Sequence, residues 1–152
     1  GCTMHYRRAK FEDSPKITPL GEAFFEASPW ARYLNLDITE LLNKLWVTEG
    51  VAIFVAENDG DIAGIVGGRV ASSPMDPENR LAQELFWYVD PKYRGTQCGI
   101  RLLHMLEQWA RNVGATALVM VEFDDPGGPI EGIYYRLGFT PIERMFIKQL
   151  TE

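Results

Sequence analysis

Residues 93–103 read Tyr-Arg-Gly-Thr-Gln-Cys-Gly-Ile-Arg-Leu-Leu, and this stretch decides the fold. The apolar run 85–89 precedes it, and apolar residues at helical spacing follow it from Ile100 to Val113. A strand that is apolar on both faces is usually central in its sheet. The pattern therefore predicts a strand, a tight glycine loop and a helix, followed by another buried strand over residues 115–123.

The predicted loop combines features of an anion site. The start of a helix offers free backbone N–H groups and partial positive charge. Arg94 and Arg101 add fixed positive charge, in a chain whose net charge is −6. A phosphate or pyrophosphate site is therefore expected here, with an ordinary glycine turn as the alternative. The residues of the site would be Arg94, Gly95, Thr96, Gln97, Cys98, Gly99, Ile100 and Arg101.

A second segment, residues 133–139, reads Ile-Tyr-Tyr-Arg-Leu-Gly-Phe and follows the loop Asp124–Pro129. Gly138 fits the left-handed residue that ends many helices. The segment therefore predicts a short helix that stops at Gly138, and a last strand that starts at Phe139.

Together the two segments resemble the GNAT superfamily of N-acetyltransferases. Residues 89–95, Val-Asp-Pro-Lys-Tyr-Arg-Gly, match the approach to the pyrophosphate loop of that family, and residues 134–139 match its later Tyr-x-x-x-Gly-Phe pattern. The resemblance covers roughly residues 50–150. It implies transfer of an acetyl group from acetyl-CoA to a primary amine, with the backbone around Tyr88 and Val89 holding the pantetheine arm and the acyl oxygen.

The sequence departs from the family pattern at two places. Gln97 stands where the loop pattern has its first glycine, and residues 124–129 replace a stretch in which the family often carries an asparagine. These departures leave a second function open, an acyl-CoA-binding or regulatory module that has lost turnover. The glycine pattern of dinucleotide-binding folds is absent, which argues against a nucleotide-binding function.

Two residues are candidates for the acid–base chemistry of amide formation. By the resemblance, Tyr134 occupies the position of the general acid, with packing beside Phe139 as the alternative role. Glu84 is the expected base, because it is the only charge on an otherwise apolar strand; a solvated strand end is the alternative. Strand alternation puts Glu84, Phe86 and Tyr88 on one face unless a bulge intervenes. Asp76 and Glu78 are weaker base candidates.

The acceptor pocket, by the same resemblance, is formed by the first two helices, their connector and the loop before the central strand. Its candidates are Phe24, Phe25, Trp30, Tyr33, Leu34 and Met75. Core packing is favoured for Phe24 and Phe25, and a pocket role for Trp30 and Tyr33. Aromatic side chains there favour an apolar amine, presented by a small molecule or a protein.

Patterning along the rest of the chain predicts alternating helices and strands. The expected strands are 5–9, 51–56, 62–70 and 84–89, the expected helices are 14–27 and 39–47, and a polar loop is expected over 71–80. The resulting fold class is α/β (α+β): a mixed, mostly antiparallel central sheet with helices on both faces, in one domain over residues 1–152.

Composition limits the setting and the partners. Two cysteines give no disulfide framework and no window approaches a membrane span, so a cytoplasmic setting is expected. The two histidines lie far apart, so no metal site is expected. The pI near 5.0 argues against nucleic acid. A homodimer is left open.

Overall fold

The computed structural model describes residues 4–123 and 130–152, so the predicted loop Asp124–Pro129 lies outside the described residues. The described strands form one sheet in the order β1-β2-β3-β4-β5. They are β1 (Met4–Arg8), β2 (Val51–Asn58), β3 (Asp61–Ser73), β4 (Asp76–Val89) and β5 (Ala117–Val119). Strands β1 to β4 pair antiparallel, and β5 runs parallel to β4. The predicted mixed, mostly antiparallel sheet is confirmed.

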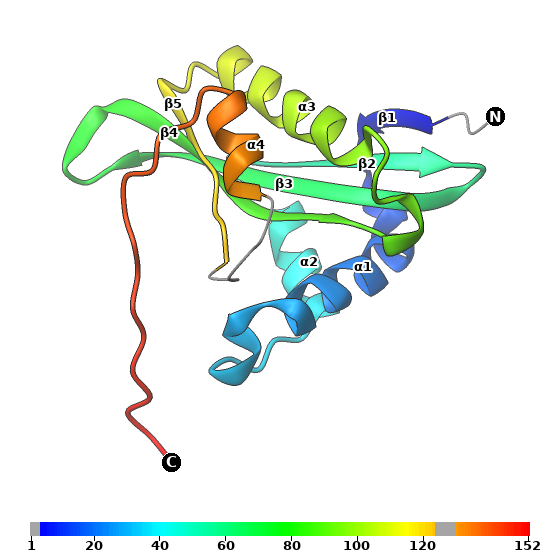
Figure 1. Ribbon diagram of the computed structural model, residues 1–152, viewed down its shortest axis with the longest axis horizontal. Helices are drawn as coiled ribbons and strands as arrows, with labels where there is room; N and C mark the ends of the chain where they lie inside the picture. Colours follow the sequence, from blue (N-terminus) through cyan, green and yellow to red (C-terminus); the bar gives the residue numbers. More distant parts are fainter. Residues whose placement is uncertain (1–3, 124–129) are drawn as a thin grey trace.

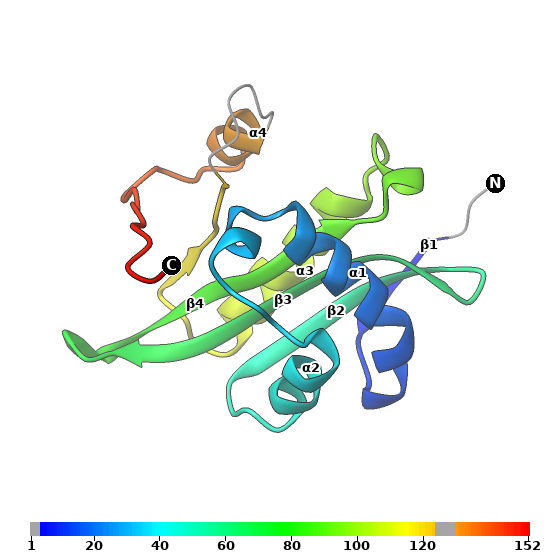
Figure 2. The same ribbon diagram turned by 90° about the horizontal axis from the view of Figure 1, so that it is seen from below.

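Helices cover both faces of the sheet, as expected. The helices α1 (Ser14–Ala27) and α2 (Ile38–Trp46) lie on one face, whereas α3 (Cys98–Asn112) and α4 (Ile130–Arg136) lie on the other (Figure 1). Figure 2 shows the first pair in front of the long strands. Short 3₁₀ turns, η1 (Phe11–Asp13), η2 (Pro29–Arg32) and η3 (Pro91–Tyr93), connect these elements.

Each face of the sheet has its own apolar core. Leu102 and Leu106 of α3 pack on Val66 of β3, and Ile17 of α1 packs with Ile53 of β2 on the opposite face. Because β2 and β3 are buried on both faces, their sequences are nearly continuous apolar runs rather than alternating patterns.

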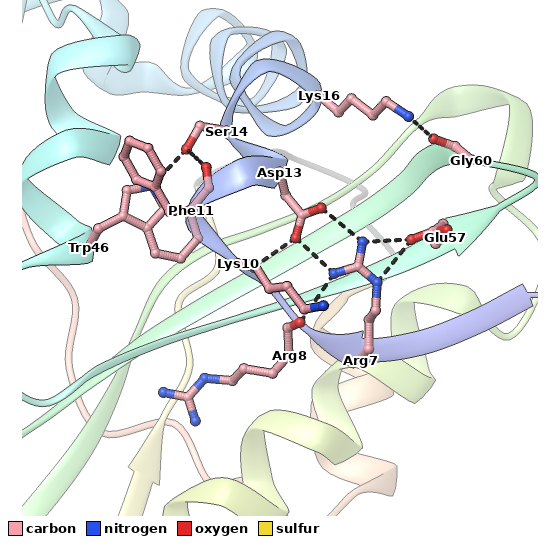
Figure 3. A network of polar contacts seen from close by, with 10 residues as sticks. All are labelled: Arg7, Arg8, Lys10, Phe11, Asp13, Ser14, Lys16, Trp46, Glu57 and Gly60. Atoms are coloured by element: carbon pink, nitrogen blue, oxygen red, sulfur yellow. Dashed lines mark hydrogen bonds and ion pairs between the residues drawn. The ribbon is translucent and has the colours of Figure 1, made fainter.

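A partly buried ion pair joins the first strand to η1, directly before the first helix. Arg7 of β1 donates to both carboxylate oxygens of Asp13, each at 2.8 Å, and to Glu57 of β2 at 2.6 Å (Figure 3). Asp13 also accepts the backbone N–H of Lys10 at 2.7 Å. This network ties β1 and β2 to the residues directly before α1.

Three sequence-based expectations about the strands differ from the structure. The predicted polar loop 71–80 is a hairpin, because β3 reaches Ser73 and β4 starts at Asp76. Its arms are almost wholly exposed, so they carry no apolar pattern that identifies a strand. Of the predicted strand 115–123, only Ala117–Val119 pairs with β4. No strand starts at Phe139 within the described residues 130–152.

Candidate active site

The loop between β4 and α3 presents free amides. Gly95 has φ +83°, and an added Cβ would meet nothing within 4 Å, so the backbone rather than space requires glycine. The Thr96 hydroxyl donates to the Tyr93 carbonyl and accepts the Cys98 N–H at 3.2 Å. The N–H of Arg101 bonds to the Gln97 carbonyl at 2.9 Å. Among the described residues, this leaves the amides of Gly99 and Ile100 without an acceptor, as an anion site needs.

The side chains of the loop lie mostly at its borders. Arg94 Nε donates to the Val89 carbonyl at 3.0 Å, and the Arg94 guanidinium lies over the Tyr88 ring. Arg101 stacks over Tyr6 of β1, 4.7 Å from the ring centroid. Positive charge therefore flanks the free amides without blocking them.

Two further side chains of the loop differ in their surroundings. Gln97 is exposed and makes no side-chain cap to α3. Cys98 is fully buried against Gly64 of β3, and burial raises the pKa of its thiol to about 11. Only the backbone of Cys98 can therefore face a ligand at the loop.

The end of β4 turns part of its backbone toward the β5 side. The N–H of Asp90 bonds to the Ala63 carbonyl of β3 at 2.8 Å. Because successive residues of a strand point their N–H and C=O groups to opposite edges, Val89 and Trp87 face the β5 side and Tyr88 faces β3. Trp87 Nε1 donates to the Gly99 carbonyl at 3.0 Å, which ties this edge to the first turn of α3. Trp87, rather than Tyr88, thus shares the open edge with Val89.

A β-bulge in β4 decides where Glu84 points. Gly67 pairs with Phe86 and Gly68 with Glu84, so Leu85 is an extra residue in the ladder. Phe86 and Tyr88 pack on the α1 and α2 face. The side chain of Glu84 instead reaches across to the segment after β5 and accepts the Val121 N–H at 3.2 Å. The simple alternation that puts Glu84, Phe86 and Tyr88 on one face is interrupted by this bulge.

Glu84 is a buried carboxyl with a shifted pKa. Its residue is 8% exposed, so it is not the solvated strand end that was the alternative. Burial raises its pKa to about 7, and the hydrogen bond from Val121 opposes the shift. A carboxyl that titrates near neutral pH suits proton transfer at that pH.

Tyr134 of α4 contacts Val121, the residue that also bonds to Glu84. Its hydroxyl donates to the Val121 carbonyl at 2.8 Å, and its ring packs between Trp87 and Phe139. Burial, with the negative charges of Glu84 and Glu122, raises the pKa of Tyr134 well above its ordinary value. The phenol therefore stays protonated and can donate. The packing beside Phe139 accompanies this geometry, and the role of general acid stays a prediction.

An apolar cavity of about 260 Å³ lies on the α1 and α2 side of the sheet. Four of the predicted pocket residues, Phe24, Phe25, Trp30 and Leu34, line it. Its other lining residues include Leu36, Ile38, Leu41, Ile65, Leu85 and Phe86. None of the described residues that line the cavity carries a charge. Leu85 and Phe86 directly follow Glu84 along β4, and Glu84 itself is not among the residues that line the cavity.

Other candidates from the sequence lie elsewhere. Met75 is 94% exposed at the tip of the β3–β4 hairpin and does not line the cavity, because the expected loop is an extended hairpin arm. Tyr33 is not among the lining residues and pairs with the guanidinium of Arg32. Asp76 and Glu78 are exposed on the same arm, roughly 20 Å or more along the strand from Glu84. Within the described residues, no group of three or more His, Cys, Asp or Glu could hold a metal ion.

Sequence reasoning missed two contributors. Val121, whose backbone joins Glu84 to Tyr134, acts through its peptide groups, which leave no trace in residue type. The apolar stripe Ile38, Leu41 and Leu45 of α2 was not named among the pocket candidates, and it lines the cavity. A helix face that packs on a core and one that lines an apolar cavity have the same period in sequence.

Comparison with known proteins identifies the family. Residues 17–139 match the model of the acetyltransferase (GNAT) family. The chain belongs to that family. The resemblance read from the loop and from the Tyr134 motif is thereby confirmed. The acetyltransferase class and the acetyl-CoA co-substrate expected from the sequence are those of the family.

Two curated relatives are similar to this chain in sequence. N-acetyltransferase 8 of Rattus norvegicus is 29% identical over 133 residues, which are 84% of this chain and 59% of that protein. N-acetyltransferase 8B of Homo sapiens is 28% identical over 81% of this chain and 55% of its own length. The GNAT domain described here thus spans a little over half the length of these relatives.

The solved structures share the fold at low identity. An aminoglycoside N-acetyltransferase in complex with CoA superposes with a TM-score of 0.78 at 16% identity, over 98% of this chain and 95% of that one. A predicted acetyltransferase with acetyl-CoA from Clostridium acetobutylicum gives 0.77 at 18% identity, over 97% of each chain. In the part of the chain that the structure describes, no helix is long and apolar enough to cross a membrane.

Proposed function

We propose that this GNAT domain transfers the acetyl group of acetyl-CoA to a primary amine that carries an apolar group. One observation carries the proposal: Glu84, which is buried and titrates near pH 7, is joined to Tyr134 through Val121, and the two residues that follow it along β4 line the apolar cavity. The family match supplies the reaction class, and the chemistry below assigns the roles of this chain's own residues.

The loop before α3 would hold the pyrophosphate of the co-substrate. The free amides of Gly99 and Ile100 supply donors at a helix N-terminus, and Arg94 and Arg101 add positive charge nearby. Gly95 gives the loop its turn, while Thr96 holds the amide of Cys98 and so shapes the loop from within. The exposed Gln97 side chain leaves the amides accessible. These residues therefore fit the group.

The open edge of β4 would bind the arm of the co-substrate. Pairing between β4 and β5 ends at Gln83 and Val119, and the backbone N–H groups of Trp87 and Val89 face that side. Such N–H groups can also stabilise charge that develops on the acyl oxygen. Of the predicted pair Tyr88 and Val89, the geometry supports Val89 for the backbone contact and leaves Tyr88 to position Arg94.

The acid–base roles follow from the protonation states of Glu84 and Tyr134. Acetyl-CoA supplies the thioester. Ionised Glu84 takes the proton that the amine loses as it forms the amide, directly or through a water. Tyr134, protonated because of its raised pKa, donates to the departing sulfur. For that it must exchange its bond to the Val121 carbonyl for one to the sulfur.

The lining of the cavity supports an acceptor that carries an apolar group. An uncharged apolar lining binds an apolar group by removing its surface from water, and it offers no partner to a second charge. The acceptor amine would lie at the end of the cavity formed by Leu85 and Phe86, which follow Glu84 along β4, with its apolar group inside. A small molecule or the amine end of a protein could present such a group.

We also propose a reducing, cytoplasmic setting, which the free thiol of Cys98 supports.

Thiol release from acetyl-CoA tests this proposal. The panel pairs amines that differ only in their apolar group, such as phenethylamine against ethanolamine, and calorimetry measures coenzyme A binding in parallel. We expect turnover with higher kcat/KM for the apolar member of each pair. Binding of coenzyme A without turnover on any amine would favour the alternative, an acyl-CoA-binding module.

A further inference from the structure

Asn58, the last residue of β2, is a buried polar side chain with no part in the chemistry described above. It is 9% exposed. Its Nδ2 donates to the hydroxyl of Tyr93 at 3.1 Å, whereas its Oδ1 is buried without a hydrogen-bond partner among the described residues. A half-satisfied buried amide lowers stability, and an apolar side chain at this position would avoid that cost. The fold alone therefore does not explain Asn58, and its one side-chain bond leads to the loop before α3.

Tyr93 connects that loop to the interior of the sheet. It belongs to η3, directly after β4, and its side chain packs against the core beneath α3. Its hydroxyl meets Asn58, which lies 35 residues earlier in the chain. Strand β3 separates β2 from β4, and β2 is paired on both of its edges. The loop is therefore anchored, through one hydroxyl, to a strand that its neighbours hold on both sides.

Hydrogen bonds continue from Tyr93 to the start of α3. The Tyr93 carbonyl accepts the Thr96 hydroxyl at 2.6 Å, and the Thr96 oxygen accepts the Cys98 N–H at 3.2 Å. Cys98 is the first residue of α3, and the free amides of Gly99 and Ile100 follow it. The position of Tyr93 therefore influences the direction in which these two amides point.

We propose that Asn58 is a positioning residue for the co-substrate: it holds Tyr93, and Tyr93 holds the loop in the conformation that binds the pyrophosphate. The inference rests on the pyrophosphate site proposed above. An anion binds more tightly to donors that are already in place, because less of the loop has to be ordered when it binds. Asn58 acts only through Tyr93, so its bond should affect the affinity for the co-substrate and leave the acetyl-transfer step unchanged.

Calorimetric titration with coenzyme A tests this role. Tyr93→Phe removes the hydroxyl alone, and Asn58→Leu replaces the amide by an apolar group of similar size. Each change should raise the Kd about three- to tenfold, the range expected for one hydrogen bond. The double variant should bind no more weakly than the weaker single variant, because both changes remove the same bond. Asn79→Leu, the same change at an exposed asparagine near the β3–β4 turn, should keep the wild-type Kd.

A donor without the pyrophosphate separates positioning of the loop from general support of the fold. With acetyl-CoA and one verified acceptor, Tyr93→Phe should raise KM and keep kcat. With S-acetylpantetheine, which lacks the pyrophosphate, kcat/KM should equal that of the wild type. An equal loss with both donors would mean that the bond supports the whole site, which contradicts the proposal.

The binding data also separate this inference from the function on which it rests. An unchanged Kd in both single variants, or losses that add in the double variant, would overturn the role of Asn58 and leave the pyrophosphate site in place. If the wild-type chain does not bind coenzyme A, the proposed site and this inference fail together. If Asn58→Leu does not fold, Tyr93→Phe decides through its Kd and the comparison of the two donors.

Discussion

Glu84 and Tyr134 hydrogen-bond to the same residue, Val121: the carboxylate accepts its N–H at 3.2 Å and the phenol donates to its carbonyl at 2.8 Å. The backbone N–H and C=O of one residue in an extended chain point to one side. The two side chains, fifty residues apart in sequence, are therefore neighbours where β4 and β5 separate. In place of a ladder hydrogen bond, the side chain of Glu84 holds the segment after β5 to β4.

The pKa of Glu84 predicts the pH dependence of activity. A base must be ionised, and burial raises this pKa to about 7, so wild-type kcat/KM should rise with pH up to about 7 and then level. Glu84→Gln should lower the rate about 10²–10⁴-fold near neutral pH and remove this inflection. Partial recovery at high pH is expected, because free amine becomes abundant. Rates across the pH range with one verified acceptor provide the measurement.

The control for this prediction is Glu78→Gln, an exposed glutamate on the same strand, which should keep the wild-type profile. If Glu84→Gln retains the rate and the inflection, the proton goes to water or to another carboxylate, and the proposal for Glu84 is wrong.

The same carboxyl predicts how stability changes with pH. The native pKa of Glu84, about 7, lies above the ordinary value of 4.5, so the native state prefers the protonated form. The contribution of Glu84 is fully present below pH 4.5 and is lost as the pH rises through 7. Glu84→Gln cannot ionise, so its free energy of unfolding should gain about 3 kcal/mol on wild type between these limits. Urea unfolding at pH 4.5 and pH 8 measures this gain; an equal difference at both pH values would contradict it.

Sequence reasoning succeeded where local chemistry decides structure. The helix that follows the glycine loop and the stop at Gly138 follow from residue type, and the structure has both. It failed where pairing through the backbone decides. The β3–β4 hairpin extends through exposed polar residues because backbone hydrogen bonds hold it. Such bonds leave no pattern in the side chains of the sequence.

The candidate site, too, could be predicted from the sequence only in part. Glu84 was visible as a lone charge on an apolar strand, and Tyr134 through its motif. Both side chains bond to Val121 only because of the bulge at Leu85. The residue types of this apolar strand do not reveal where the bulge lies. The strand expected from Phe139 pairs with no strand among residues 4–123 and 130–152.

Replacing Gln97 tests the loop. Its backbone has φ −82° and ψ 3°, which ordinary residues adopt, and its side chain is exposed. Gln97→Gly should therefore change the Kd of coenzyme A by less than tenfold, which is about 1.4 kcal/mol. Calorimetric titration measures Kd. A larger gain in affinity would mean that the glutamine obstructs the phosphates.

The Arg7 network predicts a loss of stability on substitution. Hydrogen bonds from Arg7 lower the pKa of Asp13, so its contribution is present above pH 3.8 and is lost as the pH falls through the lower native value. Asp13→Asn should reduce the free energy of unfolding at pH 7 by about 1.5–3 kcal/mol, since it weakens charge-assisted bonds in a partly buried site. Urea unfolding measures the loss, with the exposed neighbour change Glu12→Gln as control. A loss that persists unchanged at pH 2 would argue against the ionic origin.

Removing one hydroxyl separates the two roles open to Tyr134. Tyr134→Phe keeps the ring between Trp87 and Phe139 and deletes only the donor to Val121. If the phenol protonates the leaving sulfur, kcat should fall about 10²-fold or more while the Kd of coenzyme A stays nearly constant, because that bond is made in the transition state. Tyr135→Phe, one residue along and 53% exposed, is the matched control and should leave kcat unchanged. Steady-state rates, calorimetry and unfolding are measured on all three proteins. A loss of stability with kcat retained would assign the hydroxyl to holding Val121 in place, and the general acid would then have to be sought elsewhere.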